Sequence, residues 1–139
     1  MRQAQSVKKG VKQSGGTPRE FCTITVTDGI AMGHEGMKSS LISREIIADS
    51  AELTVRGHCY DALVGIAGCD KSLPGLMMSM LRLNVPSVFI YGGSILPGKF
   101  KGKDVTVVDV FEAVGKHSSG SMTSKELREL ELVACPSAG

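Results

Sequence analysis

The hydrophobic positions of the chain follow two different periods, which predicts helices alternating with short strands. Residues 2–14 are mostly polar, with Val7 and Val11 four residues apart, and this spacing predicts a weakly amphipathic helix. The pair Gly15-Gly16 that follows is expected to end it. The first element of the chain is therefore predicted to be helical.

Three segments have the pattern of β-strands. Residues 23–27 alternate Ile24 and Val26 with threonines, which favours a short strand. Residues 62–67 are continuously apolar, as expected for a strand covered on both faces. Residues 88–91 have the sequence VFIY and are closed by two glycines, which predicts a third strand.

Four further helices are predicted between and after these strands. The first begins at Ser39 or Ser40, either of which is a suitable N-cap. Pro74 suits the first turn of the second, and the loop at 94–103 precedes two more, the last of which starts with a capping box at 123–126. The apolar residues expected to mark these helices are Ile42, Ile46, Ile47, Ala51 and Val55 (one buried face), then Leu76, Met77, Met80 and Leu81, then Val107, Val110, Phe111 and Val114, and finally Leu127, Leu130 and Val133.

The order of these elements predicts both a fold class and the place of a site. Strands that alternate with helices of this length indicate βαβ units, so we expect an α/β fold with a parallel sheet flanked by helices. In open sheets of this kind, binding sites form beyond the carboxyl ends of the strands. The segments that leave the three predicted strands are expected to bring together Asp28, His34, Glu35, Cys69, Asp70 and Lys71.

The residue types at this edge suit a metal centre. Asp28 and Asp70 would supply carboxylate oxygens for a hard cation such as Mg²⁺, which keeps open positions for water or substrate. Cys69 would supply a soft thiolate, although a single thiolate cannot hold an iron–sulfur cluster. The alternative is a set of surface loops and helix caps, in which an Asp-Gly pair simply marks a turn. The residues alone leave both interpretations open.

Composition and charge narrow the class of protein. With 139 residues, of which 42% are hydrophobic and 22% charged, the chain is expected to form at most one globular domain. The net charge of +2 is too small to indicate a nucleic-acid partner. No apolar stretch approaches the roughly 20 residues of a membrane span, and the polar start lacks the apolar core of a secretion signal. We therefore expect a cytoplasmic protein, or one whose targeting segment has been lost, with no membrane partner.

The four cysteines do not form a motif of their own. Their spacing matches neither a zinc site nor a C-x-x-C redox pair, and a disulfide framework is not expected in a chain without a leader. A cysteine in such a chain is most often a small buried hydrophobe. Only one of the four falls at the predicted site; the set is Cys22, Cys59, Cys69 and Cys135.

Several ordered motifs carry a resemblance to a known family. Residues 23–37 (TITVTDGIAMGHEGM) and 43–50 (SREIIADS) closely resemble the dihydroxy-acid dehydratases. Residues 68–75 (GCDKSLPG) resemble a motif of the wider superfamily, which also contains sugar-acid dehydratases. Residues 82–93 and 95–98 favour the branch that serves branched-chain amino-acid synthesis. The resemblance extends from about residue 7 to the end of the chain.

The resemblance implies roles for four residues. Cys69 matches a cysteine ligand of the family's iron–sulfur cluster, which has two or four irons. Asp28 and Asp70 match carboxylates that bind Mg²⁺, and Lys71 matches a lysine that is carboxylated on its side-chain nitrogen and binds the same metal. His34 and Glu35 receive no ligand role, and shaping their loop is the expected one.

The resemblance also implies a reaction. The family is a hydro-lyase that eliminates water from 2,3-dihydroxy-3-methyl acids to give 2-keto acids in valine and isoleucine synthesis. An iron of the cluster acts as Lewis acid on the departing hydroxyl, and Mg²⁺ binds the carboxylate end of this small-molecule substrate. The parent enzyme is expected to be a homo-oligomer.

The chain departs from the family pattern in ways that imply an amino-terminal fragment. Family members are several times longer and carry a second, β-rich domain that supplies another Mg²⁺ ligand and the serine general base. We therefore expect 1–139 to be part of one amino-terminal α/β domain, with no catalytic base of its own. Further cluster cysteines are expected before the helix at 2–14 and just after the last residue, and Cys135 does not match either position. On its own the chain is expected to be inactive.

Two other interpretations of the resemblance remain. In the first alternative, the chain is a portion of a sugar-acid dehydratase. In the second, it is a non-catalytic α/β module that keeps the fold without the chemistry. Substrate tests on a completed protein distinguish the first, and a stable, colourless chain without metal preference would favour the second.

Overall fold

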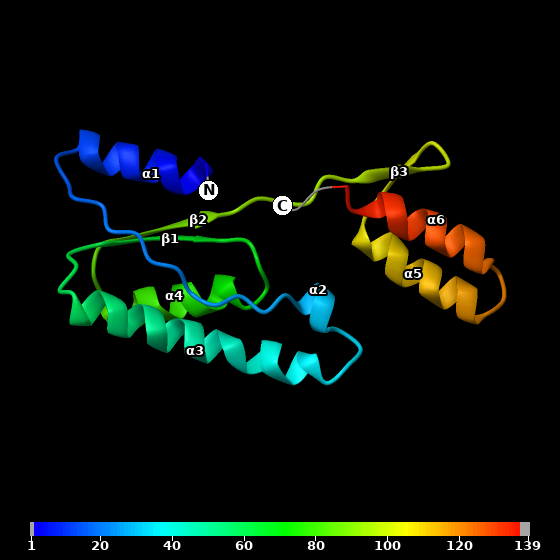
Figure 1. Ribbon diagram of the computed structural model, residues 1–139, viewed down its shortest axis with the longest axis horizontal. Helices are drawn as coiled ribbons and strands as arrows, with labels where there is room; N and C mark the ends of the chain where they lie inside the picture. Colours follow the sequence, from blue (N-terminus) through cyan, green and yellow to red (C-terminus); the bar gives the residue numbers. More distant parts are fainter. Residues whose placement is uncertain (1, 137–139) are drawn as a thin grey trace. The chain divides into compact units, whose positions relative to one another are not determined.

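The computed structural model describes residues 2–136 and divides the chain into two compact units, one ending at Gly92 and the other beginning at Gly93 (Figure 1). The first unit contains helices α1 (Arg2–Gln13), α2 (Asp28–Ala31), α3 (Gly36–Gly57) and α4 (Ser72–Leu83) and strands β1 (Leu63–Ala67) and β2 (Ser87–Tyr91). The second contains strands β3 (Gly98–Phe100) and β4 (Lys103–Val105) and helices α5 (Val107–Ser118) and α6 (Ser124–Ala134). Within residues 2–136, no helix is long and apolar enough to cross a membrane.

The first unit is built on a parallel strand pair. β1 and β2 pair in register from Leu63 opposite Ser87 to Ala67 opposite Tyr91, and α4 connects them as a βαβ crossover. Helices α3 and α4 lie side by side along one side of these strands, and α1 lies along the other (Figure 1). The predicted α/β class, with a parallel sheet flanked by helices, is confirmed.

The core of the first unit lies between α3, α4 and the strands. Ile47 and Ala51 of α3 meet Leu76 of α4 and Ala67 of β1, and all four are buried. Gly75 allows the two helices to approach closely, because a Cβ atom there would lie 2.8 Å from the Arg44 carbonyl oxygen and from Ile47 Cγ2. A second cluster of this core consists of Val55, Leu63 and Leu83, with Phe21, Tyr60, Met80 and Val85 packed against them.

The second unit is a hairpin packed with two helices. β3 and β4 pair antiparallel, and the two turn residues Lys101 and Gly102 have φ values of 49° and 78°, as in a two-residue hairpin turn with both φ positive. Gly98 passes so close to α6 that a Cβ atom there would lie 1.5 Å from the Val133 carbonyl oxygen. Capping boxes begin α5, with Thr106 and Asp109, and α6, with Thr123 and Glu126. The buried residues of this unit are Val105, Ala113, Leu130 and Ala134.

The strand predicted at 23–27 is wrong. These residues are not in a strand, and Ile24 is 51% exposed. Side-chain contacts, and no strand ladder, hold this segment in place. Ser40 Oγ donates to the Val26 carbonyl oxygen at 3.3 Å, and the Thr25 and Ser72 hydroxyls lie 3.3 Å apart. The alternation of threonines with Ile24 and Val26 therefore did not indicate a strand.

Several predicted faces are also corrected. Helix α3 begins at Gly36, three residues before Ser39, and Ile42 and Ile46 lie on its exposed side. The second face of β1 is only partly covered, since Val64 is 38% exposed and Ile66 is half-buried. The predicted loop at 94–103 contains β3 and the start of β4. For the helices and β1, the sequence pattern marks an apolar face but does not show what covers it. The other apolar residues of the predicted helix faces that are exposed are Met77, Leu81, Val107, Phe111 and Val114.

Candidate metal centre

Two segments distant in sequence meet at the carboxyl end of β1. Asp28 is the first residue of the one-turn helix α2, which directly precedes the loop into α3. Cys69, Asp70 and Lys71 follow the end of β1 after Gly68 and lead into α4. Residues after a parallel strand lie at the edge of the sheet where ligands bind in α/β folds. The local structure thus places these four residues where the sequence pattern predicted a site.

A buried ion pair joins the two segments. Asp28 is 6% exposed. Lys71 Nζ donates to Asp28 Oδ2 at 2.5 Å, and the Lys71 side chain is 16% exposed. The other carboxylate oxygen, Oδ1, accepts a hydrogen bond from the hydroxyl of Ser40 on α3. Both oxygens of the carboxylate are therefore satisfied inside the protein, one from the loop that precedes α4 and one from α3.

The partners of Asp28 keep it ionised. The hydrogen bond from Lys71 lowers the pKa of Asp28 below its ordinary value, and the hydrogen bond from Ser40 adds to this effect. Burial acts in the opposite direction, while the positive charge of Lys71 and a smaller contribution from Asp70 lower the pKa further. Asp28 is therefore a fixed negative charge at neutral pH.

The other predicted site residues divide into two groups. Cys69 is partly buried and Asp70 is exposed, both beside Lys71 in the same loop. His34 and Glu35 instead build the connection between α2 and α3. The backbone N–H of Gly36 donates to His34 Nδ1 at 3.0 Å, His34 Nε2 lies 2.7 Å from the Ile30 carbonyl oxygen, and Glu35 pairs with Lys38. The loop-shaping role expected of His34 is confirmed.

The donor set fits Mg²⁺ on one chemical condition. Among residues 2–136, no three His, Cys, Asp or Glu side chains are close enough together to hold a metal ion. When Lys71 is not carboxylated, its own ammonium group occupies the place beside Asp28 Oδ2. Carboxylation of Nζ would replace that cation by a carbamate, which together with Asp28 and Asp70 gives three oxygen donors of the kind that Mg²⁺ accepts. The residues therefore fit the metal if Lys71 is carboxylated.

The same residues do not fit a complete iron–sulfur site. Such a cluster needs several thiolate or imidazole ligands. In the described part of the chain, Cys69 is the cysteine at this edge, and Cys22, Cys59 and Cys135 are exposed free thiols. The site thus offers one thiolate to a cluster whose other ligands would have to come from elsewhere.

Sequence analysis missed one functional contact. Ser40 was considered only as a helix N-cap, but it lies inside α3, is fully buried and donates to Asp28. One signal was available, because Ser40 and Ser43 are polar residues on the face of α3 that carries Ile47, Ala51 and Val55 into the core. A buried serine needs a hydrogen-bond partner, but the sequence does not say which.

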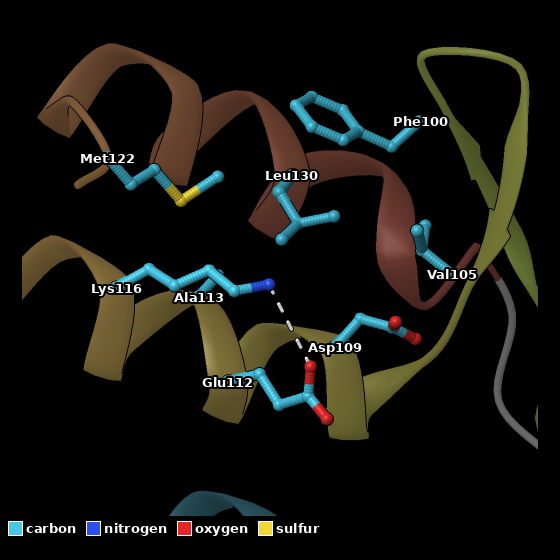
Figure 2. Close-up of a pocket in the computed structure, with 8 residues that line it drawn as sticks. All are labelled: Phe100, Val105, Asp109, Glu112, Ala113, Lys116, Met122 and Leu130. Atoms are coloured by element: carbon cyan, nitrogen blue, oxygen red, sulfur yellow. Dashed lines mark ion pairs between the residues drawn. The ribbon is translucent and has the colours of Figure 1, made fainter.

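The unit that begins at Gly93 contains a small pocket. The pocket lies between α5, α6 and the hairpin (Figure 2) and has a volume of about 140 Å³. Lys116 and Glu112, which both line it, form an ion pair at 3.8 Å. This volume is below the roughly 300–1,000 Å³ of ordinary ligand sites. The pocket is therefore small for a ligand site; its lining is Phe100, Val105, Asp109, Glu112, Ala113, Lys116, Met122 and Leu130.

The fold and the site together define an α/β unit with a carboxylate–lysine pair and a cysteine at the carboxyl end of its parallel strands. The family profile described as "Dihydroxy-acid/6-phosphogluconate dehydratase N-terminal" matches residues 1–139. The chain therefore belongs to the amino-terminal family of these dehydratases, which are hydro-lyases.

Curated relatives named dihydroxy-acid dehydratase match nearly all of the chain. Those of Pelagibacter ubique and Parvibaculum lavamentivorans are 90% and 84% identical over 139 residues. That of Metallosphaera sedula is 56% identical over 136 residues, or 98% of this chain. In each case the match covers 24% of the relative, so the chain spans about a quarter of the length of these proteins.

Proposed function

We propose that this chain forms the metal-binding, amino-terminal part of a dihydroxy-acid dehydratase. The reaction proposed is loss of water from 2,3-dihydroxy-3-methyl acids to give 2-keto acids in the synthesis of branched-chain amino acids. The observation that carries this proposal is the 90% identity, over all 139 residues, to the Pelagibacter ubique protein of that name. The pair of Asp28 and Lys71 beside Cys69 and Asp70 supports it from the structure.

Four residues would bind the cofactors. Asp28, Asp70 and carboxylated Lys71 would hold Mg²⁺, and Cys69 would be one thiolate ligand of a two-iron or four-iron cluster. Bound Mg²⁺ supplies a Lewis acid that binds and polarises substrate oxygens. Asp28 is suited to this task because its lowered pKa makes it an anionic oxygen donor without loss of a proton at neutral pH.

The remaining parts of the proposal concern the whole protein. Residues 1–139 would be part of one amino-terminal α/β domain, and the general base would come from a second, β-rich domain. The chain alone would then be inactive. The complete enzyme would be a cytoplasmic homo-oligomer that acts on a small-molecule substrate.

A chimera tests the proposal directly. This chain would replace its matching segment in the Pelagibacter ubique relative, and the protein would be reconstituted anaerobically with iron, sulfide and Mg²⁺. We expect formation of a 2-keto acid from 2,3-dihydroxy-3-methylbutanoate at a rate comparable to that of the intact relative. Asp28→Asn should abolish it, and Lys38→Met, in an exposed ion pair, should not.

The chimera also separates the neighbouring activities. The family description includes 6-phosphogluconate dehydratases, so 6-phosphogluconate should be offered in parallel. Turnover of that substrate in place of the dihydroxy acid would assign the chain to the sugar-acid branch. A folded chimera that turns over neither substrate would contradict the proposal and favour a non-catalytic module.

A further inference from the structure

Ser40 departs from the usual behaviour of a buried serine in a helix. Such a serine ordinarily donates back to a carbonyl oxygen three or four residues earlier in its own helix. Ser43 and Ser79 do this, donating to the Ser40 and Leu76 carbonyl oxygens at 2.7 and 2.8 Å. Ser40 is as deeply buried as these two, but its hydroxyl points out of α3 to the segment that enters α2. Its hydroxyl therefore donates to acceptors outside its own helix.

The acceptor that Ser40 serves is the Asp28 carboxylate. The hydroxyl carries one proton and has two acceptors within reach, Asp28 Oδ1 and the Val26 carbonyl oxygen, the latter at 3.3 Å. A carboxylate is the stronger acceptor because hydrogen bonds to an ionised group are shorter and stronger than neutral ones. The hydroxyl therefore donates to Asp28 Oδ1 in preference to the Val26 carbonyl oxygen.

This hydrogen bond fixes the orientation of the carboxylate. With Oδ1 held by α3, rotation of the carboxyl group is blocked and Oδ2 is directed at Lys71 Nζ, 2.5 Å away. Ligating carboxylates in metal sites are commonly held by such outer hydrogen bonds. We propose that Ser40 is a positioning residue that presents Asp28 Oδ2 to the metal and to Lys71, an inference that rests on the proposed function.

The test compares two serines of one helix. Ser43→Ala is the matched control, because Ser43 is 1% exposed and its hydroxyl bonds only within α3. The full chain and its Ser40→Ala, Ser43→Ala and Asp28→Asn variants would be titrated with Mg²⁺ in bicarbonate buffer by calorimetry. Loss of an outer hydrogen bond typically weakens metal binding about 10- to 100-fold. We expect a loss of that size in Ser40→Ala and none in Ser43→Ala.

A second readout does not need a metal. In metal-free protein, the labelling of Lys71 by acetic anhydride would be followed by peptide mass spectrometry. Lys71 should be labelled faster in Ser40→Ala than in the wild type, since its carboxylate partner is no longer held, and at the wild-type rate in Ser43→Ala. Both readouts are taken well below the thermal midpoint of every variant, so loss of folding does not contribute.

The outcomes separate this inference from the proposed function. If Asp28→Asn abolishes Mg²⁺ binding while Ser40→Ala binds like Ser43→Ala, the role of Ser40 is wrong and the metal site stands. If the wild type binds no better than Asp28→Asn, the proposed metal function of this chain fails, and the labelling of Lys71 then decides whether Ser40 orients Asp28. Equal labelling in the two serine variants would overturn the inference in either case.

Discussion

Lys71 Nζ and Asp28 Oδ2 lie 2.5 Å apart although 43 residues separate them in the sequence. This pair ties the start of α2 to the loop between β1 and α4, and both side chains are largely withdrawn from solvent. A change to either residue is therefore expected to alter both the candidate site and the stability of the first unit.

Removal of Lys71 should therefore destabilise the fold. A charge left buried without its partner costs far more than a broken surface pair. We expect Lys71→Met to lower the thermal midpoint clearly more than Lys38→Met, since the Lys38–Glu35 pair is 78% and 86% exposed. Circular dichroism of both variants measures this. Addition of Asp28→Asn to Lys71→Met should recover part of the loss, and no recovery would show that the charge of Asp28 is not the cause.

Glu126 gives the second unit a dependence on acid. Hydrogen bonding to Lys101, at 2.7 Å, and to Thr123 lowers the pKa of Glu126 from 4.5 to about 2. Because the folded pKa lies below the unfolded value, the stabilisation is complete above about pH 4.5 and is lost as the pH falls towards 2. Carboxyl ¹³C NMR should show the low pKa in the wild type and a higher one in Lys101→Met. An unchanged value in that variant would exclude Lys101 as the main cause.

Two glycines should respond to alanine in opposite ways. Gly98→Ala places a Cβ atom on the Val133 carbonyl oxygen, so the hairpin and α6 must separate. Gly115 lies within α5, and a Cβ atom there meets nothing within 4 Å. Gly115→Ala should stabilise the fold by about 0.5–1 kcal/mol. Methyl NMR signals of Val105 and Leu130 report on this unit: they should lose their native shifts in Gly98→Ala and keep them in Gly115→Ala.

Neighbouring isoleucines on α3 should differ in their contribution to stability. Ile47 is fully buried in the core and Ile46 is 47% exposed. Ile47→Ala should lower the free energy of unfolding by about 2–5 kcal/mol. The loss in Ile46→Ala should be well below that, as measured by urea denaturation. Similar losses would mean that the exposed side of α3 is covered in solution.

The sequence predicted the parts of the fold that depend on local pattern. The βαβ unit from β1 to β2 was recognised because an apolar run, a helical stripe and a second apolar run follow one another. The capping box that begins α6 was recognised from Thr123 and Glu126. The hairpin of the second unit was missed, since its turn depends on a positive φ at Lys101, a residue type that does not announce one.

The candidate site was also predicted only as far as local pattern allows. The position of Cys69, Asp70 and Lys71 after a buried strand follows from the order of elements, and it holds in the structure. Asp28 reaches the same edge from a segment that is not a strand. Its position was predicted correctly, but the strand from which the prediction was made does not exist. The contact of Ser40 with Asp28 depends on how α3 packs, and no local pattern contains that information.

Gly75 lies where α3 and α4 approach each other closely, and through this contact it affects the candidate site without being part of it. Lys71 lies one helical turn before Gly75, and Ser40 stands on the helix that Gly75 touches. Asp28 contacts α3 through Ser40 and the start of α4 through Lys71, so the spacing of the two helices bears on both contacts. A methyl group at Gly75 would meet the Arg44 carbonyl oxygen and Ile47, so α3 and α4 would have to move apart, and the candidate site would change although Gly75 is not part of it.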